Sequence, residues 1–212
     1  MPALLQIDSS PRTASVSSRL AAAFVEKWKR QNPGGTVFHH NTSLERFPYL
    51  DEAAIDAFFT PAAELTAAQK LALAFSDGLV DELLAADVVV LGAPMWNLSI
   101  PASLKAWIDL IVREGRTFAF TAQGVAPLVP PGKRVYVFSA RGGAYLAGTP
   151  FHDPAATPPC DLDQQEPYLR KILGVIGLTR IEFVYAEHQS SGPEAAALGL
   201  SRAESALAAL AD

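Results

Sequence analysis

The chain has 212 residues, half of them hydrophobic and 18% charged, which excludes an intrinsically disordered protein and suits a single domain spanning residues 1–212. The 17 basic and 22 acidic residues give a net charge of −5. Because the densest basic run, residues 27–30, is too short to follow a phosphate backbone, nucleic acid is not expected as a partner.

The first predicted elements are a strand, a polar loop and a helix. Residues 3–8 form a short apolar run, residues 9–18 are rich in serine, and apolar positions then recur at helical spacing as far as Pro33. A second strand is expected at 36–42. Residues 44–65 contain aromatic residues and prolines without a sustained period, which predicts a long irregular excursion.

The same order of strand, loop and helix recurs in the middle of the chain. Thr66 and Gln69 have the spacing of a capping box, and a large apolar residue every fourth position predicts a helix over 66–86. The run 87–92 is apolar almost throughout and rich in valine, which predicts a central parallel strand. Pro101 then marks the start of another helix.

The last third of the chain supplies two more strands and two more helices. Strands are expected at 135–138 and 181–185, and a helix is expected around 168–176. Pro193 opens an alanine-rich helix at the C-terminus. The segment 150–167 is rich in proline, and no element is predicted for most of it.

Five strands that alternate with helices predict an α/β fold with a doubly wound parallel sheet and helices on both faces. The number of strands favours the flavodoxin-like order 2-1-3-4-5. In such a sheet, ligands bind outside the carboxyl ends of the strands, near the switch point between the first and third strands. The loops after the first, third and fourth strands are therefore expected to border one ligand site.

The loop after the first strand contains five serines and no glycine. Short hydroxyls and the free N–H groups of a helix N-terminus bind a phosphate dianion without a lysine. The lack of a G-x-x-x-x-G-K-[ST] or G-x-G-x-x-G motif argues against a nucleoside triphosphatase and a Rossmann dinucleotide site. The alternative is that Ser15, Ser17 or Ser18 only caps the helix.

The loop after the third strand combines apolar side chains with an amide. Met95, Trp96 and Leu98 offer apolar surface to the face of a flat heteroaromatic ring, and Asn97 offers an amide to its edge. This mixture suits a flavin. The alternative is an ordinary proline-containing turn whose methionine and tryptophan belong to the core.

The loop after the fourth strand contains the paired glycines Gly142 and Gly143 behind Arg141. Glycines let backbone N–H groups approach a ligand edge with no side chain in the way. The alternative is a turn that requires positive φ. An RNA-binding Arg-Gly-Gly segment is not expected, because such segments are repeated and disordered and this copy is single.

These three loops resemble the FMN-contacting segments of the FMN-dependent NADH:quinone oxidoreductases, also called FMN-dependent NADH-azoreductases. The resemblance runs nearly end to end and is carried by segments 10–17, 95–98 and 141–143. It implies bound FMN, NADH or NADPH as electron donor, and a small quinone or azo acceptor. It also implies a homodimer whose substrate pocket is shared across the interface.

The resemblance further implies roles for individual residues. The phosphate end of FMN would be held by Ser10, Ser15, Val16 and Ser17. The ribityl chain and ring would pack on Met95, Trp96, Asn97 and Leu98. The pyrimidine side of the ring would be lined by Ala140, Arg141, Gly142 and Gly143. Phe120 would occupy a lid position over the substrate. Apart from the resemblance, Tyr145 is a second candidate for substrate contact.

Three positions depart from the pattern of that family. Ala140 stands where a hydroxyl-bearing residue is frequent, so one ring contact is in question. Val16 is apolar where a polar residue is common, and only its backbone N–H is then available. Phe120 stands where a tyrosine occurs, so substrate preference is expected to differ.

Other sites receive little support from the sequence. The single cysteine, Cys160, excludes an internal disulfide and a cysteine cage for zinc or an iron–sulfur cluster. The four histidines lack zinc-ligand spacing, and His39 and His40 are expected at the solvated edge of the second strand. No metal is predicted. With no run of about 18 apolar residues and no signal peptide, the cytoplasm is the expected location.

If FMN is bound, the cofactor carries the chemistry: a hydride passes from nicotinamide to flavin, and two electrons then pass to the acceptor in a ping-pong cycle. No nucleophile is needed, and no G-x-S-x-G motif is present. The alternatives are an NAD(P)H-dependent FMN reductase that releases reduced flavin, and a flavodoxin-type electron carrier without turnover. A hydrolase or phosphate-binding module would use the serine loop alone.

Overall fold

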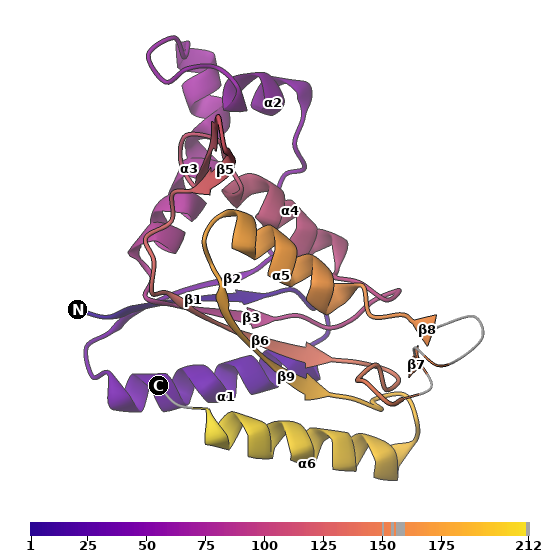
Figure 1. Cartoon of the computed structure of the whole chain (residues 1–212). Coiled ribbons are helices and arrows are strands. Elements are labelled where there is room, and N and C mark those ends of the chain that lie inside the picture. Colours follow the sequence, from indigo (N-terminus) through magenta and orange to yellow (C-terminus); the bar gives the residue numbers. More distant parts are fainter. Residues whose placement is uncertain (150, 154, 156–159, 211–212) are drawn as a thin grey trace.

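A five-stranded parallel sheet forms the centre of the computed structural model, which describes residues 1–149, 151–153, 155 and 160–210 (Figure 1). The strands are hydrogen-bonded in the order β2-β1-β3-β6-β9, and all four pairings are parallel. This is the predicted order 2-1-3-4-5 with a flavodoxin-like fold. The strands span Ala3–Asp8 (β1), Thr36–Asn41 (β2), Val88–Gly92 (β3), Arg134–Ala140 (β6) and Arg180–Ala186 (β9).

Helices cover both faces of the sheet, because alternate side chains of each strand point to opposite faces (Figure 1). Leu4 belongs to the apolar cluster beneath α1 and α6, whereas Leu5 belongs to the cluster beneath α3, α4 and α5. All residues of β1 and β3 are buried, as expected for central strands. The helices span Val16–Gln31 (α1), Ala67–Ala85 (α3), Ala102–Ile111 (α4), Gln165–Val175 (α5) and Pro193–Ala209 (α6).

Capping residues set where the helices begin. The capping box predicted at Thr66 and Gln69 is present at the start of α3. Ser15, one of the three serines named as candidate caps, is the N-cap of α1, so that helix begins at Val16. The α5 helix begins earlier than predicted, because the carboxylate of Asp163 accepts hydrogen bonds from the N–H groups of Gln165 (2.9 Å) and Glu166 (3.1 Å).

Several small elements differ from the sequence-based expectation. The excursion predicted at 44–65 contains a helix, α2 (Glu52–Phe58), whose first turn is capped by Asp51. A hairpin of β4 (Phe118–Thr121) and β5 (Gly124–Pro127) follows α4. The proline-rich segment contains the short strand pair β7 (His152–Asp153) and β8 (Cys160–Asp161). Residues 150, 154 and 156–159 of this segment lie outside the described part of the chain.

The loops after β1, β3 and β6 leave the sheet at its carboxyl edge, as the parallel order requires. None of the helices within the described residues is long and apolar enough to span a bilayer.

Candidate functional site

A cavity of about 260 Å³ lies where the three predicted loops meet at the carboxyl edge of the sheet. A fourth loop, between β9 and α6, closes one side of it. Seven of the twelve residues predicted to bind the cofactor line this cavity. They are Ser10, Ser15, Val16, Met95, Ala140, Arg141 and Gly142; the remaining lining residues are Arg12, Ala14, Pro94, Gln189 and Ser190.

The serine loop serves the helix and the cavity at once. Ser15 Oγ accepts a hydrogen bond from the N–H of Ser18 (3.3 Å), so Ser15 is the N-cap of α1, and it lies 3.0 Å from the hydroxyl of Ser17. Ser15 and Val16 line the cavity, so the first turn of α1 opens onto it. Because the first N–H groups of a helix have no intrahelical partner, this end of the cavity offers donors to an anion.

Arg12, which was not among the predicted site residues, adds a positive charge. It lies in the loop after β1, is exposed and lines the same cavity. The signal was its position between Ser10 and Ser15, within a segment already assigned to phosphate binding. Together with the first turn of α1, Arg12 makes this end of the cavity suitable for a phosphate.

The loop after β3 forms a tight two-residue turn. The N–H groups of Trp96 and Ser99 each donate to the other residue's carbonyl, at 2.9 and 3.1 Å. Asn97 and Leu98 between them have φ of 49° and 71°, a pattern typical of a type I′ turn. Positive φ is tolerated by asparagine but costs energy for leucine, so the turn holds a strained residue beside the cavity.

Met95 and Trp96 differ in burial, so the alternative that both belong to the core holds only for the methionine. Met95 is buried, and its N–H donates to the carbonyl of Ala140 (2.9 Å), which ties the second loop to the third. The Trp96 side chain is 42% exposed. It lines two larger cavities.

These two cavities of about 530 and 450 Å³ share Trp96 and Ala102 as lining residues. The larger one is also lined by Asn97 and Tyr168. Burial raises the pKa of Tyr168 to about 12, with a further contribution from the charge of Asp109, so the phenol stays protonated and can donate a hydrogen bond. Asn97 therefore lies beside Trp96 rather than in the cavity of the serine loop.

The glycine turn after β6 has no space for a side chain. A Cβ at Gly142 would lie 3.1 Å from Ser190 Oγ, and one at Gly143 would lie 2.8 Å from the ring of Phe151. The alternative interpretation of this segment was a turn that requires positive φ. It is wrong, because neither Gly142 nor Gly143 is among the described glycines with positive φ. Close approach, rather than backbone conformation, requires glycine here.

The loop between β9 and α6 supports this turn through its backbone. The N–H groups of His188, Gln189 and Ser190 donate to three successive carbonyls of the turn, those of Gly143, Arg141 and Gly142, at 2.9, 2.9 and 3.0 Å. This loop was not predicted to border the site. Its only signal was its place after the strand at the far edge of the sheet.

The Arg141 side chain points into the protein. It is fully buried, its Nη2 lies 2.8 Å from a carboxylate oxygen of Asp163, and its guanidinium lies 4.1 Å from the centre of the Tyr185 ring. Arg141 therefore borders the cavity as part of the turn, while its charge is used in the interior.

The other five residues predicted to bind the cofactor do not line this cavity. Ser17 is buried behind Ser15, and Trp96, Asn97, Leu98 and Gly143 lie in the adjoining turns. The two residues predicted to meet substrate are farther removed. Phe120 is 64% exposed on the β4–β5 hairpin, and Tyr145 stacks on Phe151 and lines a separate cavity of about 480 Å³.

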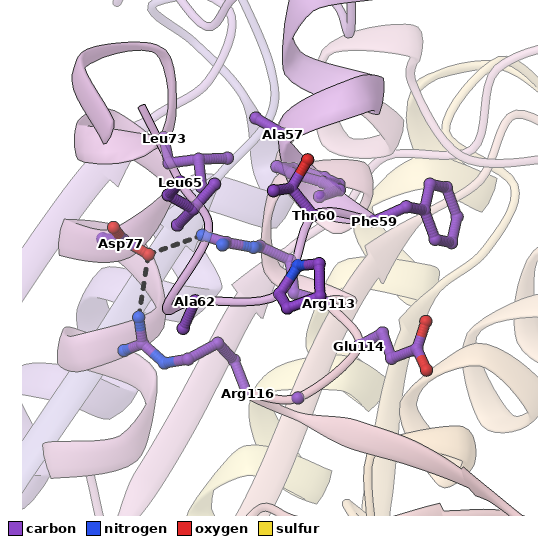
Figure 2. A pocket seen from close by; sticks show the side chains of 13 residues that line it. Ala57, Phe59, Thr60, Ala62, Leu65, Leu73, Asp77, Arg113, Glu114 and Arg116 are labelled. Atoms are coloured by element: carbon purple, nitrogen blue, oxygen red, sulfur yellow. Dashed lines mark hydrogen bonds and ion pairs between the residues drawn. The ribbon is translucent and has the colours of Figure 1, made fainter. Parts of the chain in front are cut away.

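A further cavity of about 410 Å³ lies between α2, α3 and the segment after α4 (Figure 2). Arg113 and Arg116 both contact the carboxylate of Asp77 there, at 2.6 and 2.8 Å. None of the three predicted loops contributes to it. This cavity is therefore separate from the candidate site.

The neighbouring residues His39 and His40 differ in burial and in their contacts. His39 is half exposed at the edge of the sheet, as predicted, whereas His40 is mostly buried between the carboxylates of Glu45 (2.8 Å) and Glu82 (2.7 Å). Within the described residues, no group of three or more histidine, cysteine or acidic side chains is arranged to hold a metal ion.

Comparison with known proteins gives concordant matches over almost the whole chain. Residues 2–211 match the family model described as flavodoxin-like fold. The FMN-dependent NADH:quinone oxidoreductase of Nostoc sp. is 43% identical over 209 residues, which are 98% of this chain and 97% of the relative. The enzyme of the same name from Burkholderia pseudomallei is 44% identical over 211 residues, 99% of this chain and all of the relative.

Solved structures agree with these matches. An azoreductase from Bacillus anthracis superposes with a TM-score of 0.80 at 31% identity, covering 98% of this chain and 99% of that one. An FMN-dependent NADH-azoreductase from the same species, solved in complex with FMN, superposes with a TM-score of 0.82 at 24% identity and covers both chains fully. At that identity the second match supports the fold alone.

Proposed function

Because the chain belongs to the flavodoxin-like fold family, and within it to the FMN-dependent NADH:quinone oxidoreductases, we propose that the cavity at the carboxyl edge of its sheet holds FMN. The chain is an enzyme of that class: it transfers two electrons from NADH to a quinone or azo acceptor. The convergence of three loops on one cavity, lined by the first turn of a helix and by Gly142, carries the assignment of the site.

The residues present fit the two ends of FMN. The first turn of α1, the hydroxyl of Ser15 and the charge of Arg12 suit the phosphate. Met95 supplies apolar surface, and the glycine turn brings backbone close to the cavity without a side chain. We propose residues 1–212 as one FMN-binding domain, since the sheet draws strands from both ends of the chain.

Bound FMN would supply the chemistry of hydride transfer between the nicotinamide and the acceptor. The protein binds and orients. The Trp96 side chain and the two cavities beside it offer an apolar surface for the donor and the acceptor in turn, and the protonated Tyr168 offers a hydrogen bond to an acceptor oxygen or nitrogen. One pocket that serves both substrates in succession accounts for the expected ping-pong kinetics.

We further propose that two chains share the substrate pocket. The cavities beside Trp96 are open, and Trp96, Tyr49 and Phe120 leave large apolar surfaces exposed. Phe120 was predicted to meet substrate but lies on a hairpin outside the described cavities of its own chain, which supports a contact with the pocket of a second copy. The single cysteine suits a reducing compartment, and we propose the cytoplasm.

A visible spectrum of the purified protein, followed by addition of NADH and then menadione, tests this function. The expected result is flavin absorbance that bleaches with NADH and returns with the quinone over many turnovers. A colourless protein that does not bind added FMN contradicts the assignment and favours the phosphate-binding alternatives. Release of reduced FMN during gel filtration favours an FMN reductase, and bleaching without catalytic turnover favours an electron carrier.

A further inference from the structure

Arg141 is an arginine with no exposed side-chain surface, placed directly before the glycine turn. Its Nη2 pairs with Asp163 at 2.8 Å, its Nε donates to Ser139 Oγ at 3.2 Å, and its plane lies over the ring of Tyr185 at 4.1 Å. Tyr185 in turn donates a hydrogen bond to Glu166. Burial and then this carboxylate raise the pKa of Tyr185, so it remains a neutral phenol under the guanidinium.

One chain of hydrogen bonds leads from Arg141 to the loop after β3. Ser139 Oγ donates to Gln165 Oε1 at 2.5 Å, and Gln165 Nε2 donates to the carbonyl of Ala93 at 3.1 Å. Asp163, which pairs with Arg141, also caps the start of α5. The guanidinium therefore joins the end of β6, the end of β3 and the start of α5.

A second set of contacts leads forward along the turn. Nη1 of Arg141 lies 3.9 Å from Glu187 Oε1, and the same oxygen accepts hydrogen bonds from the N–H groups of Tyr145 (2.6 Å) and Leu146 (3.2 Å). The carbonyl of Arg141 accepts from Gln189 (2.9 Å). The backbone on both sides of Gly142 and Gly143 is thus held through groups that contact Arg141.

Burying a guanidinium in a protein core is energetically unfavourable. Removing an ion from water opposes its burial, and a buried ion pair offsets this only with good geometry and further hydrogen bonds. Apolar residues of similar volume therefore often stabilise a core at least as well. The side chains that contact Arg141 lie at the carboxyl ends of β6 and β9, in the loop after β9 and directly before α5; they are Ser139, Tyr185, Glu187 and Asp163. Through Glu187 and the carbonyl of Arg141 these contacts reach the backbone of the turn, and through Ser139 and Gln165 they reach the loop after β3. Such a distribution serves the geometry of the turn more directly than the stability of the sheet.

We propose that Arg141 is a positioning residue for FMN, acting through the backbone of residues 140–143 rather than by contact with the cofactor. This inference rests on the proposed function. By fixing the turn, Arg141 determines where the backbone N–H groups of residues 140–143 meet the edge of the flavin. Those N–H groups affect both the affinity for FMN and the stability of the reduced flavin. The role differs from the cofactor contact that the family resemblance implies for this residue.

Arg141→Met tests the proposal, with Arg141→Lys as the conservative variant and Arg113→Met as the matched control. Arg113 is also buried, pairs with one carboxylate, Asp77 (2.6 Å), and lies over one ring, Phe58 (4.6 Å), but it lines the separate cavity between α2 and α3. FMN affinity is measured by fluorescence quenching, the flavin midpoint potential by spectroelectrochemistry, and the thermal stability of the apoprotein by calorimetry.

The expected result for Arg141→Met is a dissociation constant for FMN raised about tenfold, the equivalent of one lost hydrogen bond, together with a displaced midpoint potential. Arg141→Lys keeps the charge beside Asp163 and recovers part of both. Arg113→Met leaves affinity and potential at their wild-type values. Wild-type affinity and potential in a folded Arg141→Met, or an equal effect in Arg113→Met, overturns the proposal.

Asp163→Asn keeps the test decisive if Arg141→Met does not fold. It retains the shape of the carboxylate and the cap on α5 but removes its charge, and the expected effects on FMN affinity and potential are in the same direction and smaller. No effect in this folded variant overturns the proposal. A wild-type protein that does not bind FMN refutes the proposed function first, before any variant is compared.

Discussion

Replacing Gly142 by valine is expected to abolish tight FMN binding while leaving the sheet intact. A Cβ at this position lies 3.1 Å from Ser190 Oγ and 3.5 Å from Ser190 Cβ, so even alanine forces the serine to move by a few tenths of an ångström. The γ carbons of valine then enter a cavity of only about 260 Å³. Overpacking costs about 1–3 kcal/mol, and a displaced backbone N–H costs about 1 kcal/mol more.

These contributions add to about 2–4 kcal/mol, which raises the dissociation constant for FMN by about 30- to 1,000-fold. Gly142→Ala, with the Ser190 contact alone, is expected to lose about fivefold. The assay is quenching of FMN fluorescence on titration with apoprotein. Gly78→Ala is the control, because Gly78 lies exposed within α3 with no atom in reach of an added Cβ, and it should gain about 1 kcal/mol in stability without change in FMN affinity.

A double variant isolates the contact on which this reasoning depends. Ser190→Ala removes the Oγ that a Cβ at Gly142 would meet, so Gly142→Ala should cost less FMN affinity in that background than in the wild type. An unchanged cost would mean that the serine is not what excludes a side chain. Wild-type affinity in Gly142→Val would refute the placement of the cofactor against the turn.

Three other changes test separate parts of the site and fold. Ser15→Asp retains a cap on α1 but places a negative charge beside the phosphate, so FMN binding should weaken about tenfold while riboflavin binding is unchanged; equal loss for both ligands would contradict the phosphate assignment. Phe120→Ala should raise KM for quinone about tenfold with no change in FMN affinity, if the hairpin meets a partner's pocket; an unaltered KM would exclude that contact. Burial lowers the pKa of His40, but Glu45 and Glu82 outweigh it and raise the pKa, so its stabilising effect is complete below about pH 6.5 and is lost as pH rises through the folded-state pKa. The free energy of unfolding of His40→Gln should lack this part of the pH dependence, and identical profiles would contradict it.

The fold was predictable because its signals are local and repeated. The run 87–92 predicted a central strand because it is apolar almost throughout, and the observed β3 lies between β1 and β6 with every residue buried. Side-chain hydrogen bonds at Thr66 and Ser15 set two helix starts that the sequence also indicated. Strand order followed from the alternation of strands with helices.

Short elements escaped prediction because too few residues carry their pattern. The α2 helix has seven residues and a single buried side chain, so its period cannot be seen, and only Asp51 marked its start. The β4–β5 hairpin has four residues in each strand, which is too short for a convincing alternation. The early start of α5 depends on the Asp163 carboxylate, whose role as a cap became visible only in three dimensions.

The site was predictable in its location and less so in its contacts. Topology brings three loops to one edge whatever their details, and the cavity there is lined by residues of all three. Positive φ at Leu98 and the inward direction of the Arg141 side chain depend on hydrogen bonds and a carboxylate far along the chain. The loop that contains Ser190 follows the edge strand β9 and contacts the glycine turn. No pattern in the residues of this loop indicates that contact.

A crystal structure of the protein with bound FMN would show where the cofactor lies. We expect the phosphate at the N–H groups of Val16 and Ser17, the ring between Met95 and the turn at Gly142, and the guanidinium of Arg141 still paired with Asp163 beneath it. Flavin bound anywhere else, or an Arg141 side chain turned outward onto the cofactor, would contradict this expectation.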